Sequence, residues 1–260
     1  MAKRRRKRRV KKQAKQVSVL FIFCVFLFCS VLLLRRARDA KTIDFTHLPQ
    51  NSQGLTGVAL GIDVSEWQRD IDWEAVKDDG YSFAIIRSSF GIDQTQDEAF
   101  IQNVEGAKDA GLNVGAYHYS HATTVEQAKW EADYVIELLD DYRWEYPIYY
   151  DIETEQQNHL SQDELTEIAL TFLNKLDEAG YEVGIYAAES WFYHRLDMDA
   201  LQNYEVWVAS YTDFLDFDKP YQMWQYTQNG KVAGISGDVD INIVYYDYPH
   251  QIKSARKNNY

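Results

Sequence analysis

Two carboxyl side chains at the end of one expected strand are the residues of this chain best placed to do chemistry. Residues 146–153 (YPIYYDIE) place aromatic and β-branched residues after a proline, a composition typical of a short buried strand. Side chains alternate between the two faces of a strand, so Asp151 and Glu153 point the same way. Two close carboxylates repel each other, and one of them tends to keep its proton near neutral pH. A protonated Glu153 beside an ionised Asp151 would suit acid-catalysed cleavage of a glycosidic bond.

The same eight residues also fit a strand end whose acids only cap the next turn. Acids at other expected strand ends favour the catalytic interpretation, because Asp63 follows the first strand and Asp240 lies in the last. If the carboxyl ends of the strands converge, Asp63, Asp151, Glu153 and Asp240 form one acidic site. Chance placement of acids in so acidic a chain is the alternative. We expect neither a metal ion nor a cofactor at this site.

Aromatic residues make up 15% of the chain, so most of them must pack in the core. A few fall at the expected mouth of the site, where an aromatic face can stack on a sugar ring. Core packing remains an alternative role for each of them, and we favour the two tryptophans as substrate contacts. The candidates are Trp67, Tyr119, Tyr149, Tyr186 and Trp224.

From residue 58 onward, strand-like runs alternate with helical runs. Gly80, Gly111 and Gly180 each stand between an expected helix and the next strand, where a glycine can end the helix in a left-handed conformation. Strand, helix and strand at this spacing predict parallel βαβ units. The expected helices include 73–79, 98–110, 125–139 and 164–179, and the expected strands are 58–64, 81–87, 112–119, 147–152, 182–186, 206–210, 221–226 and 238–244.

After residue 186 the helical runs become sparse, and the count is about eight strands and five helices. We therefore predict an irregular α/β barrel, with functional side chains at the carboxyl ends of its strands. A doubly wound open sheet is the alternative. That fold favours a glycine-rich phosphate turn after the first strand, and residues 61–65 (GIDVS) are not one.

The amino-terminal part of the chain has a different composition. Residues 17–34 (VSVLFIFCVFLFCSVLLL) are 18 residues without a charge, just long enough to span a bilayer as a helix. Ten Lys and Arg residues precede this run and four follow it closely, which predicts a cytoplasmic amino terminus and an extracellular remainder. A cleaved signal peptide is the alternative, but two arginines stand where its small-residue cleavage site would lie.

These patterns divide the chain into five parts. We expect a basic cytoplasmic segment at 1–16, a single-pass membrane helix at 17–34, a linker at 35–57, the barrel at 58–247 and a tail at 248–260. Both cysteines, Cys24 and Cys29, lie in the expected membrane helix, so the barrel has no disulfide. The exported part, about 220 residues, is long enough to fold on its core alone, and we expect a monomer.

Charge separates the same parts and excludes one class of partner. Residues 1–41 hold 14 of the 27 Lys and Arg residues and one of the 40 acidic residues. The remaining 219 residues thus carry 13 basic and 39 acidic side chains, a formal charge near −26. Such a charge argues against nucleic acid as the partner of the exported part.

Several short motifs together resemble one known family. The sequence is similar to glycoside hydrolase family 25, the Chalaropsis-type lysozymes or N-acetylmuramidases, over roughly residues 58–247. Six blocks in the family's order make the match specific. They are 61–65 (GIDVS) with 67–68 (WQ), 115–119 (GAYHY), 150–153 (YDIE), 206–211 (VWVASY), 223–226 (MWQY) and 239–242 (VDIN).

The resemblance implies a flattened barrel and hydrolysis of the β-1,4 bond between N-acetylmuramic acid and N-acetylglucosamine in peptidoglycan. By position, it makes Glu153 the general acid and Asp151 the partner that orients the substrate's acetamido group or stabilises positive charge. Asp63 and Asp240 would be the remaining acids of the cleft. No wall-binding repeats follow the barrel, and the expected membrane helix would keep the enzyme near the glycan strands instead.

Two other interpretations fit part of the sequence. Chitinases of family 18 also carry Asp-x-Glu at a strand end, in a longer pattern with two earlier acids, but Tyr146 and Tyr149 stand at those two positions here. A non-catalytic wall-binding module on the same barrel is the alternative from another functional class, because glycan binding would use the same cleft.

Overall fold

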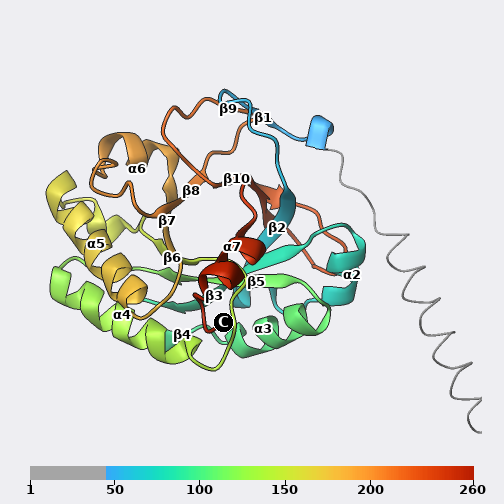
Figure 1. Ribbon diagram of the computed structural model, residues 1–260, viewed down its shortest axis with the longest axis horizontal. Helices are drawn as coiled ribbons and strands as arrows, with labels where there is room; N and C mark the ends of the chain where they lie inside the picture. The colour runs from blue at the N-terminus through green and yellow to red at the C-terminus, as the bar shows by residue number, and fades with distance from the viewer. Residues whose placement is uncertain (1–44) are drawn as a thin grey trace, which may run out of the picture. The chain divides into compact units, whose positions relative to one another are not determined.

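A closed barrel of β-strands forms the centre of the domain, with helices packed around it (Figure 1). The computed structural model describes residues 45–260. Within them, the strand order is β2-β11-β10-β8-β7-β6-β5-β3, and pairing of β2 with β3 closes the barrel, which confirms the predicted α/β barrel. The eight strands are β2 (Ala59–Val64), β3 (Phe83–Phe90), β5 (Asn113–Tyr119), β6 (Ile148–Asp151), β7 (Val183–Ala188), β8 (Glu205–Ala209), β10 (Met223–Gly230) and β11 (Val239–Val244).

Neighbouring strands of the barrel are parallel except at β11, which runs antiparallel to both β10 and β2. Helices follow the early strands, as the sequence predicts, with ends that differ from the expected ones by at most two residues. The late strands β8, β10 and β11 are joined by loops. Antiparallel pairing explains this for β10 and β11, because an antiparallel neighbour needs no helical crossover. The helices of this outer layer are α2 (Trp73–Asp78), α3 (Phe100–Asp109), α4 (Val125–Leu139), α5 (Gln162–Glu178) and the short α6 (Glu189–His194).

Local signals set the ends of the helices. Helix α5 begins at a capping box, in which the Ser161 backbone N–H donates to Glu164 Oε2 (2.8 Å) and the Ser161 hydroxyl accepts from the Glu164 N–H. Gly111 and Gly180 follow α3 and α5 with φ of +78° and +94°, a region that costs other residues energy. The strand can therefore start directly after each helix.

Both faces of the barrel strands are apolar, so the domain has two cores. The outer faces pack against the helices, with Ile148 and Tyr150 of β6 fully buried there. The inner faces fill the barrel with large side chains, among them Tyr149 and Trp207, whose ring centroids are 5.1 Å apart. Strands buried on both faces read as continuous apolar runs, without the alternation that would reveal which side faces inward.

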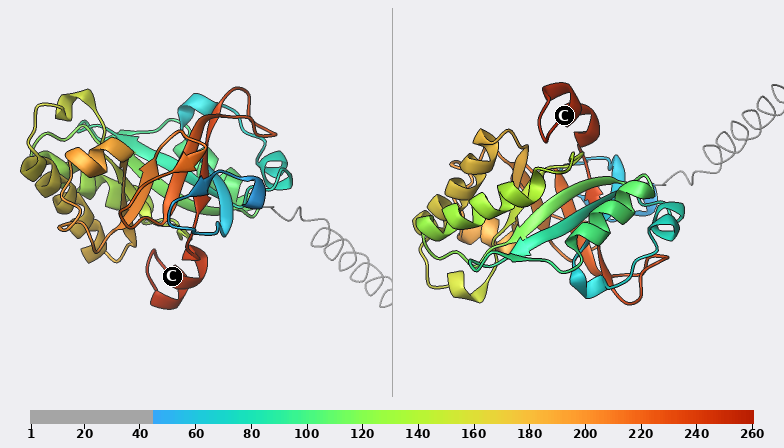
Figure 2. Two further views of the ribbon diagram at one scale, coloured as in Figure 1. Left: turned by 90° about the horizontal axis from the view of Figure 1, so that it is seen from above. Right: turned by 90° about the horizontal axis from the view of Figure 1, so that it is seen from below.

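Helix α7 (Tyr248–Ala255) closes the amino-terminal end of the barrel (Figure 2). The Asn258 side chain, fully buried, donates to the Trp144 and Tyr146 carbonyls and accepts from the Glu182 N–H. The expectation that residues 248–260 form a mere tail is therefore wrong. They are an integral part of the domain, because Asn258 satisfies backbone groups that would otherwise be buried without partners.

Part of the expected linker is also structured. Residues 45–57 include a single helical turn, η1 (Phe45–His47), and β1 (Gln50–Asn51), which pairs in parallel with β9 (Phe214–Leu215). One further short strand, β4 (Thr95–Gln96), pairs with the end of β3. The expected cytoplasmic segment and membrane helix lie outside the described residues. Within residues 45–260, no helix is long and apolar enough to cross a membrane.

Candidate active site

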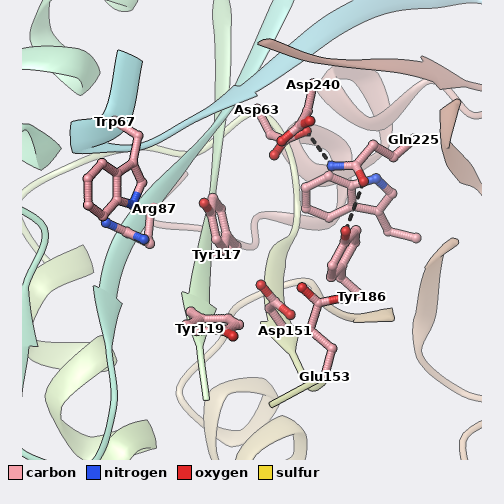
Figure 3. A pocket seen from close by; sticks show the side chains of 11 residues that line it. Asp63, Trp67, Arg87, Tyr117, Tyr119, Asp151, Glu153, Tyr186, Gln225 and Asp240 are labelled. Atoms are coloured by element: carbon pink, nitrogen blue, oxygen red, sulfur yellow. Dashed lines mark hydrogen bonds between the residues drawn. The ribbon is translucent and has the colours of Figure 1, made fainter. Parts of the chain in front are cut away.

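The four acids singled out in the sequence meet in one pocket at the carboxyl ends of the parallel strands (Figure 3). Asp63 comes from β2, Asp151 ends β6 and Glu153 follows it two residues later. Asp240 is near the amino end of β11, which lies at the same edge because β11 runs the opposite way. The pocket encloses about 310 Å³ and is lined by Asp63, Trp67, Arg87, Tyr117, Tyr119, Asp151, Glu153, Tyr186, Trp207, Gln225 and Asp240.

Asp63 and Asp240 form a hydrogen-bonded carboxyl pair. Burial raises the pKa of Asp63 to about 6, although Asn242 and Gln225 donate hydrogen bonds to its Oδ2 at 2.8 and 2.9 Å and act in the opposite direction. Burial and then the charge of Asp63 raise the pKa of Asp240 to about 8. The pair therefore holds a proton near neutral pH, as expected for carboxyl groups in contact.

Asp151 lies deeper in the pocket than Glu153. Its side chain is almost fully buried, and its Oδ1 has no hydrogen-bond partner among residues 45–260. Burial, followed by the charges of Glu153 and Asp63, raises the pKa of Asp151 well above its usual range, although Arg87 opposes this shift. The sequence predicts that Asp151 is the ionised partner, but burial without a donor favours its neutral form here.

Glu153 is more accessible to solvent than Asp151. Its side chain reaches solvent at the pocket opening, and in Figure 3 its carboxyl group lies beside that of Asp151. Two effects raise the pKa of Glu153. The larger is the loss of hydration between the pocket walls, and the smaller is the negative charge of Asp240. An acid with a raised pKa and access to solvent can give a proton to a bound molecule.

Trp67 and Arg87 form the wall opposite Gln225 and Asp240 (Figure 3). Trp67 is 75% exposed on the short helical turn η2 (Glu66–Gln68). Arg87 Nη2 donates to Glu66 Oε1 at 2.8 Å, and Arg87 Nε donates to Asp97 Oδ2 at 2.7 Å. These bonds hold the turn, so Trp67 is an exposed aromatic face on a fixed support.

The structure places three of the five candidate aromatic residues at the pocket and excludes two. Trp67, Tyr119 and Tyr186 line it. Tyr149 is fully buried one layer deeper in the barrel, two residues before Asp151 on the same strand face. Trp224 is fully buried on the outer face of β10, where its indole N–H donates to the Ser210 carbonyl at 2.8 Å. The prediction that Tyr149 and Trp224 contact the substrate is therefore wrong, because both are buried and neither lines the pocket.

Four pocket residues were missed in the sequence: Arg87, Tyr117, Trp207 and Gln225. Gln225 follows Trp224 and points inward because adjacent strand residues face opposite sides. Its Oε1 accepts from the Tyr186 and Tyr211 hydroxyls, each at 2.8 Å, while its amide donates to Asp63. A sequence signal was available for Tyr117, because it is two residues before the candidate Tyr119 and therefore lies on the same face of the strand.

Comparison with known proteins agrees with this geometry. Residues 62–235, about two-thirds of the chain, match the sequence model of the family "Glycosyl hydrolases family 25". The chain belongs to glycosyl hydrolases family 25. As a member of that family, it is a glycoside hydrolase, and the barrel with an acidic pocket at its carboxyl edge is its catalytic domain.

Relatives of known name or structure cover most of the barrel. Lysozyme M1 of Streptomyces globisporus is 31% identical over 219 residues, which are 78% of this chain and 71% of that protein. The uncharacterized protein YegX of Escherichia coli (strain K12) is 31% identical over 190 residues, 70% of this chain and 68% of YegX. The modular autolysin LytC from Streptococcus pneumoniae, solved in complex with a synthetic peptidoglycan ligand, is 30% identical with a TM-score of 0.66. That match covers 72% of this chain and 46% of LytC.

Proposed function

We propose that this glycoside hydrolase cleaves the β-1,4 bond between N-acetylmuramic acid and N-acetylglucosamine in peptidoglycan. The observation that carries the proposal is the pair Asp151 and Glu153, side by side in a pocket that also holds Asp63 and Asp240. Family membership and the lysozyme and autolysin relatives support the same substrate.

Glu153 is the general acid of the proposed reaction. Its accessible carboxyl group gives its proton to the leaving glycosidic oxygen, and its raised pKa keeps that proton available at mildly acidic pH. Asp151 lies beneath it and meets the group next to the reacting carbon, the acetamido group of the sugar. There Asp151 can orient that group or, once ionised, stabilise the positive charge that develops in the transition state.

The remaining acids and aromatic residues bind and orient the glycan. The Asp63–Asp240 pair forms one wall, and Gln225 and Asn242 hold Asp63 in place. Trp67 stacks on a sugar ring, while the hydroxyls of Tyr119 and Tyr186 face the polar substituents of the sugar.

The proposal includes a location at the cell membrane. The uncharged run 17–34 serves as a single-pass anchor, and the excess of Lys and Arg before it keeps the amino terminus in the cytoplasm. The catalytic domain is then extracellular, where it meets peptidoglycan. These residues lie outside the described part of the chain, so the support is the sequence pattern.

Analysis of the products of digestion tests the proposed activity. The full chain, purified in a mild detergent, is incubated with purified peptidoglycan, and the new reducing ends are identified after borohydride reduction. We expect reduced N-acetylmuramic acid at the new ends, and Glu153→Gln serves as the matched inactive control. New N-acetylglucosamine ends would show that the other glycosidic bond is cut. Retention of glycan without new reducing ends would favour a non-catalytic wall-binding module.

A further inference from the structure

A buried acid outside the pocket has no role in the reaction described above. Glu131 of α4 is 1% exposed and packs behind the ends of β5 and β6. Its Oε2 accepts from the Ser120 hydroxyl at 2.8 Å and from the Tyr150 hydroxyl at 3.1 Å. Its Oε1 accepts from the His121 backbone N–H at 2.9 Å and lies 3.4 Å from His118 Nε2. Glu131 is therefore the centre of a buried polar cluster.

A carboxylate buried in this position must be stabilised by hydrogen-bond donors, because burial of an uncompensated charge is costly. Burial alone would raise the pKa of Glu131. The His118 ring and the donors on His121 and Ser120 outweigh burial and lower the pKa below its usual value. The carboxylate is thus ionised, and its partners are the groups that its charge holds in place.

These partners connect Glu131 to the segment that carries both proposed catalytic acids. Tyr150 directly precedes Asp151, and the Ser120 backbone N–H donates to the Asp151 carbonyl at 2.9 Å. The Tyr150 and Ser120 hydroxyls are also 2.6 Å apart. Glu131 therefore fixes the strand at Asp151 through two neighbours, Ser120 and Tyr150, which also contact each other.

The cluster also reaches the residue after Glu153. Gln157 is fully buried, and its side-chain amide donates to Ser120 Oγ at 3.4 Å and to the Ala122 carbonyl at 3.0 Å. Its Oε1 accepts from the Thr154 backbone N–H at 3.1 Å. The turn after β6 is thus attached to the same cluster as the strand before it.

We propose that Glu131 is a positioning residue that fixes the spacing of Asp151 and Glu153 through Ser120, Tyr150 and Gln157. It touches neither substrate nor reacting atoms. This inference rests on the proposed function, because it concerns the geometry of the two acids in that reaction. A displacement of about 1 Å at such a pair can lower the rate about 100-fold, even when the change is far from the chemistry.

Kinetics of variants test the proposal on the full chain in detergent. Glu131→Gln keeps the shape but removes the charge, and Tyr150→Phe removes one hydroxyl from the cluster. We expect kcat to fall about 10- to 100-fold in Glu131→Gln and less in Tyr150→Phe, with KM for soluble glycan strands within about twofold of wild type. In the double variant, the two losses should be less than additive, because both changes release the same segment.

Glu145→Gln is the matched control. Glu145 is also a partly buried acid, which accepts from the Val114 N–H at 3.0 Å and pairs with Lys108 at 3.1 Å, but it precedes β6 at the opposite end of the barrel. We expect this change to lower the melting temperature and leave kcat per folded molecule unchanged. A purely structural role for Glu131 would give the same result in Glu131→Gln, and that outcome would overturn the proposal.

Three further outcomes remain distinguishable. If Glu131→Gln does not fold, Ser120→Ala and Tyr150→Phe test the same connection, and wild-type kcat in both would refute it. If the wild-type enzyme itself releases no muropeptides, the proposed function fails. If the wild type is active and the variants match its kcat, only the positioning role fails.

Discussion

Asp63 and Asp240 lie directly opposite each other across the antiparallel strands β2 and β11, and their carboxyl groups share a hydrogen bond. Burial, followed by the charge of Asp63, raises the pKa of Asp240 to about 8, because both disfavour a second negative charge. The active site thus keeps two carboxyl groups together at a cost in stability that grows as the pH rises.

Replacement of Glu153 separates catalysis from binding. Glu153→Gln keeps the size of the side chain but cannot give up a proton. We expect the rate of muropeptide release to fall about 10²- to 10⁴-fold, the usual contribution of a positioned acid, while binding to peptidoglycan survives. Release of products and sedimentation with insoluble peptidoglycan measure the two properties on one sample. Cleavage at the wild-type rate would show that Glu153 is not the acid.

The rate should depend on pH with an optimum on the acid side of neutrality. The pKa values of Asp151 and Glu153 are both raised, first by burial. A general acid acts in its protonated form, so activity is present below the raised pKa and is lost as the pH rises through it. The alkaline limb of kcat then reports deprotonation of the pair. An unchanged kcat up to strongly alkaline pH would contradict this assignment.

Asp240→Asn should lower turnover but stabilise the fold at high pH. The folded pKa of Asp240 is about 8 against an ordinary 3.8, so the folded state retains a proton that the unfolded state releases between these values. The free energy of unfolding therefore falls as the pH rises across this interval, and asparagine removes the effect. Thermal melts at about pH 4 and about pH 8 should show a more favourable change at the higher pH. A lower melting temperature at both pH values, with normal turnover, would mark Asp240 as a structural acid.

Trp67→Ala should weaken binding of glycan more than it slows the reaction. If a stacked sugar contributes as much as a stacked aromatic pair, about 0.5–1.5 kcal/mol, KM for soluble glycan strands should rise about 2- to 10-fold. Trp130→Ala is the control, because Trp130 of α4 is also exposed, at 48%, but does not line the pocket. Equal KM values in the two variants would remove Trp67 from the substrate site.

A chain that begins at Lys41 should be soluble, monomeric and active. The catalytic domain has its own core in residues 45–260, closed at one end by α7. Size-exclusion chromatography and muropeptide release measure the three properties. A fragment that fails to fold would show that the residues before Lys41 contribute to the structure.

Local rules explain why so much of this domain could be predicted from its sequence. The two-residue period of a strand places Asp151 and Glu153 on one face, because the pleat alternates side chains regardless of the surroundings. Glycine ends the helices at Gly111 and Gly180, since a positive φ is a property of the single residue. The acids expected at a common mouth were found there because parallel strands share one carboxyl edge.

The face on which a buried side chain lies was decided only by the closed barrel. Both faces of β6 and β10 are apolar, so the sequence carries no sign of which residue of the pair Trp224 and Gln225 faces inward. The depth of Tyr149 likewise depends on the helix α7 that closes the other end of the barrel.

The sequence alone determined which acids lie at the mouth of the pocket, because residue type and strand period are local properties. Tertiary structure decided their charges. Asp63 and Asp240 are far apart along the chain, and only the pairing of β2 with β11 brings their carboxyl groups into contact. Burial and the repulsion between neighbouring charges depend on that contact, so the pKa values of the site emerge only when the barrel closes.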